Sequence, residues 1–386
     1  MLTPEDLKQR FIPFKSLRYS TEAFIDYCIP ECSPKFNYAL IGSGVSQNPR
    51  QPVSLGERHG FQVGGISMPH GKTNPPHMHF TAEVFMCVKG RWRMQWGFNP
   101  EPQSAEIGEG DVISVPTWIY RGFTNIGVDD GFMFTGLGQD STGGILWGPS
   151  TLEAARSQGV HLTADYRMID ERQGQQWDDT MTRLQPMTQE EIAALQVWSP
   201  EAMGQRIVRF ADLQWSGEAL LDASLPGCGA RIAPVLGLGM SQARGHRAPV
   251  DNPHSFSLEW LKLPPGGSVS RHLLREKQVL IVYQGTLQVS VENLPASSAA
   301  AGPEAISVSP QGSPEGWDSF AMPANCWRSL RNTGDTDVLA LVMTSGDGRK
   351  RIEWADTVVQ AASAIGLAVD PDGYVGAARF INRAQT

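Results

Sequence analysis

The chain contains one pattern of residues twice. When the sequence is shifted by 195 positions against itself, it aligns without a gap for about fifty positions, and after a 12-residue insertion in the second copy the shift becomes 207. The matched pairs include Pro69–Pro264, Gly71–Gly266, His77–His272, Gly90–Gly285, Pro116–Pro323, Arg121–Arg328 and Asn125–Asn332. A repeat of this length indicates two copies of one whole domain rather than a solenoid of short units.

The first copy carries a set of potential metal ligands. His77 and His79 are two positions apart, so on a β-strand both side chains leave the same face. Glu83 follows four positions later and shares that face if the strand continues. Two imidazoles and one carboxylate suit a divalent transition metal, Fe(II) first, while Zn, Mn or Ni also fit. A His-x-His pair also occurs by chance, so the surrounding residues have to show whether this pair belongs to a metal site.

The second copy lacks this set. Leu274 stands at the position of His79, and Gln278 stands at the position of Glu83. Only His272 remains, and one imidazole does not hold a metal ion. We therefore predict that the second domain kept its fold and lost its site.

An arginine is present in both copies, as Arg121 and Arg328, and it permits three interpretations. A buried guanidinium can pair with Glu83 in place of a metal, since an unpaired buried carboxylate is costly, or it can hold a backbone carbonyl or a loop. It can instead grip the carboxylate of a substrate with two parallel hydrogen bonds. In the third interpretation the side chain points to the surface. Because Arg328 persists opposite the neutral Gln278, pairing with Glu83 alone does not explain both arginines.

These residues resemble the two motifs of the cupin superfamily. The first motif, G-x5-H-x-H-x3/4-E-x6-G, is similar to residues 71–90, and the second, G-(D)-x4-P-x-G-x2-H-x3-N, is similar to residues 110–125. Two positions depart from the second motif, because Trp118 replaces the glycine after the proline and Arg121 replaces the last metal-binding histidine. The resemblance implies an all-β fold with two double-stranded β-helix barrels, the cupin or jelly-roll barrel, in one chain.

The order of patterns along the sequence predicts five segments. They are an N-terminal arm over residues 1–55, whose last part belongs to the repeat, a first cupin domain over 56–150, a linker with helices over 151–215, a second cupin domain with a degenerate site over 216–350, and a C-terminal helix and tail over 351–386. Thr188 followed by Glu191 is typical of a capping box and predicts a helix start in the linker. The insertion of the second copy, residues 296–316, is rich in Ser, Ala, Gly and Pro and predicts an exposed, mobile loop.

Composition excludes several classes of protein. The net charge of −8 and the pI near 5.5 argue against sequence-independent binding to nucleic acid, which needs a basic surface. The sequence contains no run of about eighteen apolar residues, which a membrane-spanning helix would need. The polar, acidic start lacks the features of a signal peptide, so we expect a cytoplasmic protein. Five cysteines without a paired framework predict reduced thiols.

The resemblance also implies classes of function. In architecture the chain is similar to two-cupin dioxygenases of the gentisate and hydroxynaphthoate type, which implies Fe(II), a substrate bound through its carboxylate and a homo-oligomer. That group takes its last metal ligand from the position of Arg121. The sequence therefore predicts a non-haem Fe(II) dioxygenase-like protein acting on a small or aromatic carboxylic acid, with Arg121 as the carboxylate anchor. The alternatives are a non-catalytic cupin that binds or senses a small acid, and a metal-dependent isomerase, lyase or decarboxylase.

Overall fold

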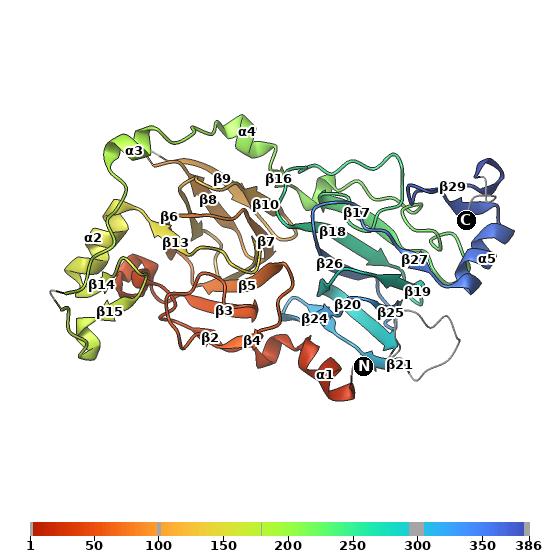
Figure 1. The fold of residues 1–386 in the computed structure, drawn as a ribbon, viewed down its shortest axis with the longest axis horizontal. Coiled ribbons are helices and arrows are strands. Elements are labelled where there is room, and N and C mark those ends of the chain that lie inside the picture. The colour runs from red at the N-terminus through yellow and green to blue at the C-terminus, as the bar shows by residue number, and fades with distance from the viewer. Residues whose placement is uncertain (1–2, 99–101, 179, 293–304, 382–386) are drawn as a thin grey trace. The chain divides into compact units, whose positions relative to one another are not determined.

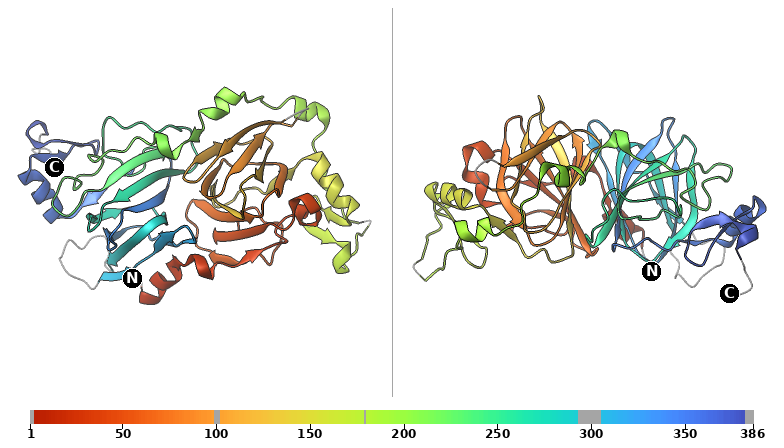
Figure 2. Two further views of the ribbon diagram at one scale, coloured as in Figure 1. Left: turned by 180° about the vertical axis from the view of Figure 1, so that it is seen from behind. Right: turned by 90° about the horizontal axis from the view of Figure 1, so that it is seen from above.

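The computed structural model describes residues 3–98, 102–178, 180–292 and 305–381. The chain divides into two compact units. Residues 17–212 form what we call the first unit, and residues 1–16 together with 213–386 form the second unit. Within each unit the strands curve around a core, as Figures 1 and 2 show, and almost all strand pairs are antiparallel. The predicted all-β fold is confirmed.

The first unit contains two larger sheets. In one, the strands follow the order β16-β10-β7-β12-β5-β3-β2 with β4 beside β3, and in the other they follow the order β13-β6-β11-β8-β9. The strands are β2 (Tyr19–Ser20), β3 (Phe36–Ile41), β4 (Val53–Leu55), β5 (Phe61–Met68), β6 (Thr73–His79), β7 (Glu83–Lys89), β8 (Trp92–Trp96), β9 (Gln103–Ile107), β10 (Val112–Val115), β11 (Arg121–Asn125), β12 (Gly131–Gly138), β13 (Ile145–Trp147) and β16 (Ile207–Val208).

Side chains from both sheets form one core in the first unit. Ile66 of β5 and Phe85 of β7 belong to the same buried cluster as Met94 of β8 and Phe123 of β11. Along β8, buried residues alternate with more exposed ones, because successive side chains of a strand point to opposite faces. Each large apolar side chain buried in this way contributes roughly 1.5–3 kcal/mol. The alternation of Trp92, Arg93 and Met94 in the sequence therefore marks the inner face of the barrel.

The second unit repeats this arrangement along the path β17-β18-β26-β20-β25-β19-β27. β20 is 15 residues long and spans the counterparts of both β7 and β8. The strands are β1 (Phe11–Ile12), β17 (Arg231–Leu236), β18 (Phe256–Leu263), β19 (Ser268–Leu274), β20 (Gln278–Glu292), β21 (Ala305–Val308), β22 (Gln311–Ser313), β23 (Gly316–Trp317), β24 (Ser319–Met322), β25 (Cys326–Asn332), β26 (Val338–Ser345) and β27 (Glu353–Trp354).

The first residues of the chain belong to the second unit. Helix α1 (Pro4–Arg10) begins at a capping box formed by Thr3 and Asp6, and it buries Leu7 in the core of that unit. The short strand β1 then pairs antiparallel with β24, where Phe11 lies opposite Phe320. The segment predicted as an N-terminal arm is therefore divided, because β2, β3 and β4 are strands of the first unit.

Each barrel is followed by the same helix and hairpin. Helix α2 (Pro149–Ser157) with β14 (Val160–Leu162) and β15 (Met168–Asp170) corresponds, at a shift of 207, to α5 (Asp356–Ala364) with β28 (Leu367–Val369) and β29 (Val375–Ala377). The predicted C-terminal helix is present as α5. The segment predicted as a linker thus begins with residues of the repeat.

The remainder of that segment contains short helices. Helix α3 (Gln189–Ala193) starts at the predicted capping box, in which Thr188 and Glu191 bond reciprocally to each other's backbone nitrogen. Helix α4 (Pro200–Gly204) starts at Ser199, whose hydroxyl caps the backbone nitrogen of Ala202. The sequence signal for a helix start is confirmed at Thr188.

Part of the insertion in the second copy is ordered into strands. Residues 296–304 of the predicted loop lie outside the described residues. In residues 305–316, however, β21 pairs with β20 and β22 pairs with both β20 and β23. These residues are mostly exposed, as predicted, but they are not a loop, because β21 pairs with β20 at residues 289–292 and β22 pairs with it at residues 285–286.

Two further observations concern the helices and the cysteines. No helix in the part of the chain that the structure describes is long and apolar enough to cross a membrane. The five cysteines are buried, free thiols.

Candidate metal centre

The polar residues singled out in the sequence come together within the first unit. His77 and His79 lie on β6, Glu83 is the first residue of β7, and Arg121 is the first residue of β11. Arg121 lies directly opposite His77 in the pairing of β11 with β6. β6 ends at His79, and Glu83 belongs to the other sheet, so one strand does not carry all three ligands. The three side chains meet because the chain turns from one sheet to the other between His79 and Glu83.

The three predicted ligands present their donor atoms to one small region. His77, His79 and Glu83 each offer one ligand atom, and these atoms lie within 4.8 Å of one another. Nε2 of His79 is 3.4 Å from Oε2 of Glu83, and all three residues are buried. Bonds from zinc to nitrogen or oxygen are about 2.0–2.2 Å long, so two donors on one ion lie roughly 3–4 Å apart. The donor set and its spacing therefore fit one divalent transition metal ion.

Both histidines are held by backbone carbonyl groups. Nδ1 of His77 lies 2.9 Å from the oxygen of Pro75, and Nδ1 of His79 lies 3.5 Å from the oxygen of Gly144. A carbonyl oxygen only accepts, so these contacts favour a proton on Nδ1, which would leave the lone pair of Nε2 available to a metal. Burial, with a smaller effect from Arg121, lowers the pKa of His77 to about 3 and that of His79 well below its usual value. Both imidazoles are therefore neutral at neutral pH, as metal ligands must be.

Arg121 is buried, so the interpretation that it points to the surface is wrong. Nη1 donates to Oε2 of Glu83 at 3.1 Å, and Nη2 donates to the carbonyl oxygens of Pro116 at 2.7 Å and Ile119 at 3.4 Å. Burial raises the pKa of Glu83, and the charge of Arg121 opposes that rise. The guanidinium thus joins the glutamate to the loop before β11.

The second barrel keeps these backbone contacts around its remaining histidine. Nδ1 of His272 lies 2.8 Å from the oxygen of Ser270. Arg328 donates to Oε1 of Gln278 at 2.9 Å and to the oxygen of Pro323 at 2.9 Å. Arg328 also donates to the oxygen of Cys326, the counterpart of Ile119. Both arginines therefore hold the carbonyl oxygens two and five positions before them, which explains why an arginine persists opposite a neutral glutamine.

A buried lysine lies behind His77, and no motif in the sequence pointed to it. Lys35 is 1% exposed and donates hydrogen bonds to Oδ2 of Asp26 and to Oδ1 of Asn74. The amide nitrogen of Asn74 lies 3.1 Å from Nδ1 of His77. Because an amide N–H donates, this contact favours a lone pair on Nδ1, opposite to the tautomer that the carbonyl of Pro75 favours. His77 therefore has two neighbours that compete for its proton arrangement.

A cavity of about 80 Å³ opens beside the three donors, and residues of both sheets and of the loop 43–46 line it. Gly64 of β5 lies in this wall, paired with Ala39 of β3 and with Thr135 of β12. A Cβ atom at Gly64 would approach Oγ1 of Thr135 to 2.9 Å, so the missing side chain keeps this part of the cavity open.

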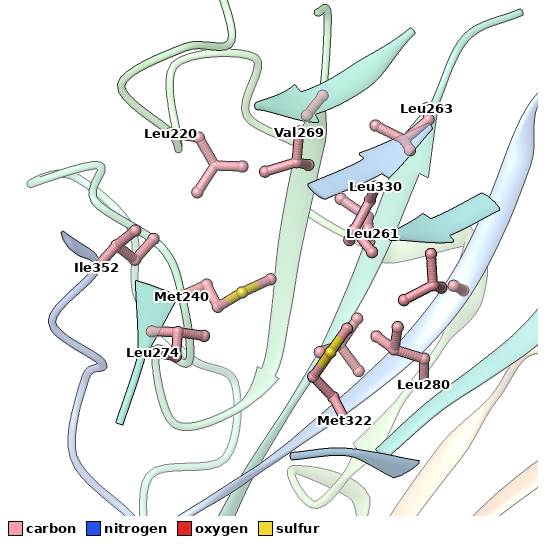
Figure 3. Close-up of a cluster of buried hydrophobic side chains, with 14 of the residues drawn as sticks. Leu220, Met240, Leu261, Leu263, Val269, Leu274, Leu280, Met322, Leu330 and Ile352 are labelled. Atoms are coloured by element: carbon pink, nitrogen blue, oxygen red, sulfur yellow. The ribbon is translucent and has the colours of Figure 1, made fainter. Parts of the chain in front are cut away.

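The second barrel is filled at the equivalent place. Glu259 stands at the position of Gly64, and its two carboxylate oxygens accept hydrogen bonds from the backbone nitrogen of Met240 at 3.1 and 3.0 Å. The sulfur of Met240 lies 3.3 Å from Nε2 of Gln278. Figure 3 shows Met240 together with Leu274, which replaces the second histidine, in the buried hydrophobic cluster of this unit. Side chains thus take the space that the first barrel leaves open.

Comparison with known proteins agrees with this architecture. A family model described as Cupin matches residues 63–152. Similar solved structures include oxalate decarboxylase from Lactobacillus farciminis in a formate complex, at 12% identity, 91% coverage of this chain, 89% of that chain and a TM-score of 0.52. Vicilin from Solanum lycopersicum is similar at 11% identity, 90% coverage of this chain, 87% of that chain and a TM-score of 0.52. No curated protein matches the sequence. At such identities the likeness shows the fold, and it spans both units.

Proposed function

The chain belongs to the cupin superfamily and has its two-barrel architecture, and we propose that its first barrel binds a divalent metal ion and acts there on a small carboxylic acid. The observation that carries the proposal is the meeting of three buried donor atoms, from His77, His79 and Glu83, within 4.8 Å of one another. A cavity begins at the same residues.

Charge supports an acid as the ligand. The two imidazoles are neutral, and the charges of Glu83 and Arg121 balance each other. A bound divalent ion therefore leaves an excess of positive charge in a buried place, where only an anion can compensate it. Such an ion supplies Lewis-acid chemistry to a bound carboxylate, and Fe(II) also supplies redox chemistry with dioxygen.

The size of the cavity favours a small acid over an aromatic one. An engineered cavity of about 150 Å³ in a protein core binds benzene. The cavity beside His77 measures about 80 Å³, which is roughly half of that volume. We therefore narrow the predicted substrate class to small, non-aromatic carboxylic acids.

Two reaction classes fit this arrangement. Fe(II) with open coordination positions fits a dioxygenase, whereas oxalate decarboxylase, a structural neighbour, acts on a small acid according to its name. Turnover under anaerobic conditions separates the two, because a dioxygenase consumes dioxygen and a lyase or decarboxylase does not.

The contacts of Arg121 favour a positioning role over that of a substrate anchor. Its guanidinium already holds Glu83 and the carbonyl oxygen of Pro116. We propose that Arg121 fixes the carboxylate of Glu83 in the direction of the two histidines.

One observation favours a second candidate function. The ion pair between Glu83 and Arg121, at 3.1 Å, satisfies the carboxylate without any metal ion. A non-catalytic cupin that binds a small acid would need no more than this pair and the cavity.

The test is the metal content of the full-length protein. We expect about one metal ion per chain by elemental mass spectrometry after expression with Fe, Mn, Zn or Ni, and loss of that ion in His77→Ala and in His79→Ala. His272→Ala is the matched control from the second barrel and should leave the metal content unchanged. A wild-type protein without metal under every condition would retire the enzyme proposal in favour of the acid-binding protein.

A further inference from the structure

We infer that the cavity of the first barrel takes a small acid that carries a hydroxyl group at the end remote from Glu83, and that Gln51 accepts the hydrogen bond of this hydroxyl. The inference rests on the proposed function for the end that holds the carboxylate. The hydrogen bond proposed at the other end is supported by the contacts of Gln51.

The amide of Gln51 has a fixed orientation. Nε2 donates to the carbonyl oxygen of Asn37 at 3.1 Å and to that of Pro52 at 3.3 Å. Because carbonyl oxygens only accept, these contacts decide which end of the amide is nitrogen. Oε1 is then a buried acceptor that has no hydrogen-bond partner among the described residues, and Gln51 lines the cavity. A buried acceptor without a partner is costly, so a ligand that donates to it gains affinity.

Gln51 lies at the end of the cavity remote from Glu83. Its amide is held at β3, through the carbonyl oxygen of Asn37. In the sheet, β5 and β12 separate β3 from β7, the strand that begins with Glu83. Neighbouring strands are about 4.8 Å apart, so the backbones of β3 and β7 are separated by roughly 14 Å along the sheet.

Gly64 provides the floor between the two ends. It lies on β5, and it is paired with Ala39 of β3 on one side and with Thr135 of β12 on the other. In the second barrel the corresponding Glu259 and the adjoining Met240 occupy this space. The barrel with the three donors is thus the one whose cavity continues past the position of Gly64 towards Gln51.

The chemistry of the far end selects the ligand. A neutral oxygen that accepts one hydrogen bond favours a hydroxyl group. A second carboxylate would be repelled by this oxygen. An ammonium group would be buried there without a charged partner, which is costly. A short hydroxy acid, with its carboxylate at the metal ligands, satisfies both ends.

The experiment compares matched acids on the metal-loaded, full-length protein by titration calorimetry. The pairs are acetate with glycolate, propanoate with 3-hydroxypropanoate, and butanoate with 4-hydroxybutanoate. For at least one chain length we expect the hydroxy acid to bind about tenfold tighter than its partner, the effect of one buried hydrogen bond gained. Equal affinities within every pair, or no binding of any acid, would overturn the inference.

Variants then assign the preference to Gln51. Gln51→Met keeps the length of the side chain and removes the acceptor, so the ratio of the two affinities should fall to within about twofold. If the methionine variant does not fold, Gln51→Asn replaces it. The shorter side chain withdraws the oxygen by one carbon, so the ratio of the two affinities should fall in the same way. Gly64→Ala is the matched control, because it narrows the cavity and should weaken both acids of a pair alike. A preference that survives at Gln51→Met would contradict the assignment.

Metal content of the same samples separates this inference from the proposed function. A metal-free protein that still prefers the hydroxy acid would overturn the proposed metal site and leave the role of Gln51 intact. A metal-loaded protein that binds both acids equally would leave the proposed metal site intact and overturn the role of Gln51.

Discussion

At the scale of single residues, the buried arginine of each barrel donates to equivalent backbone carbonyl groups but faces a different side chain. Arg121 faces the carboxylate of Glu83, whereas Arg328 faces the neutral amide of Gln278. Both donate to a proline carbonyl. The comparison therefore isolates the effect of one buried charge.

We expect Arg121→Lys to lower the free energy of unfolding by roughly 1–3 kcal/mol, because lysine lacks the planar fork and leaves a buried acceptor unpaired. Urea unfolding measures the loss, and Arg328→Lys is the control, with a smaller loss because Gln278 carries no charge. Added metal should reduce the loss at Arg121, since the ion would then hold Glu83. Equal losses at the two arginines would show that the charge of Glu83 plays no part.

Glu259 makes the stability of the second barrel depend on pH. Burial raises the pKa of Glu259 to about 8 against a usual value of 4.5, although the backbone nitrogen of Met240 and the charge of Lys350 oppose the rise. Between these two values the folded protein keeps a proton that the unfolded chain has released. The free energy of unfolding therefore falls as the pH rises from 4.5 to 8, by up to about 1.4 kcal/mol per pH unit.

We expect Glu259→Gln to remove this dependence, because glutamine keeps an oxygen for Met240 and does not titrate. Urea unfolding at pH 5, 6.5 and 8 compares the two proteins. The wild type should lose a few kcal/mol relative to the variant across this range. Parallel curves would mean that Glu259 is ionised in the folded protein throughout.

At the scale of elements, the two segments that resemble the cupin motifs fold as strands of the first barrel. The first, residues 71–90, covers β6 and β7, and the second, residues 110–125, covers β10 and β11. The second cupin motif has a glycine two positions after its proline, Pro116 in this chain. Trp118 stands at the glycine position of that motif and has a φ of 56°, and its counterpart Asn325 has a φ of 54°. The left-handed backbone that glycine favours is thus retained without glycine.

Other elements depend on partners that are distant in the sequence. The strands of residues 305–316 form because β20 presents an open edge, which local composition does not reveal. No sequence pattern indicated the buried Lys35 and Asn74, since neither belongs to the His-x-His pattern. The sequence does distinguish these two positions between the copies, because the second copy has Ala230 and Val269 there. Polar residues found only in the copy with the metal ligands point to a role near that site.

Helix α1 and strand β1 should be necessary for the second unit and dispensable for the first. Deleting residues 1–16 removes the buried side chains of Leu7 and Ile12, and each contributes roughly 1.5–3 kcal/mol. Hydrogen exchange followed by mass spectrometry should show lost protection in peptides of residues 213–386, above all in β24, and unchanged protection in residues 17–212. Leu7→Ala with Ile12→Ala serves as a milder control. An equal loss in both units would contradict the assignment of this segment.

At the scale of the whole molecule, the two barrels share one framework and differ in what their interiors contain. The sequence predicted the duplication and the three donors, because both are repeated or spaced in a regular way. It did not predict the cavity, because a cavity depends on residues from many strands. Gly64 and Glu259 occupy equivalent places, yet only the structure shows that one leaves a space and the other closes it.

The pairing of β1 with β24 also sets an order of events during synthesis. About 300 residues separate the two strands, so at 5–20 residues per second β1 leaves the ribosome roughly 15–60 s before its partner. The first barrel can complete its sheets during that interval, while Phe11 and Ile12 wait without a neighbouring strand. Closure of the second barrel therefore requires both early and late parts of the chain, so a truncated nascent protein would expose its first apolar residues to quality control.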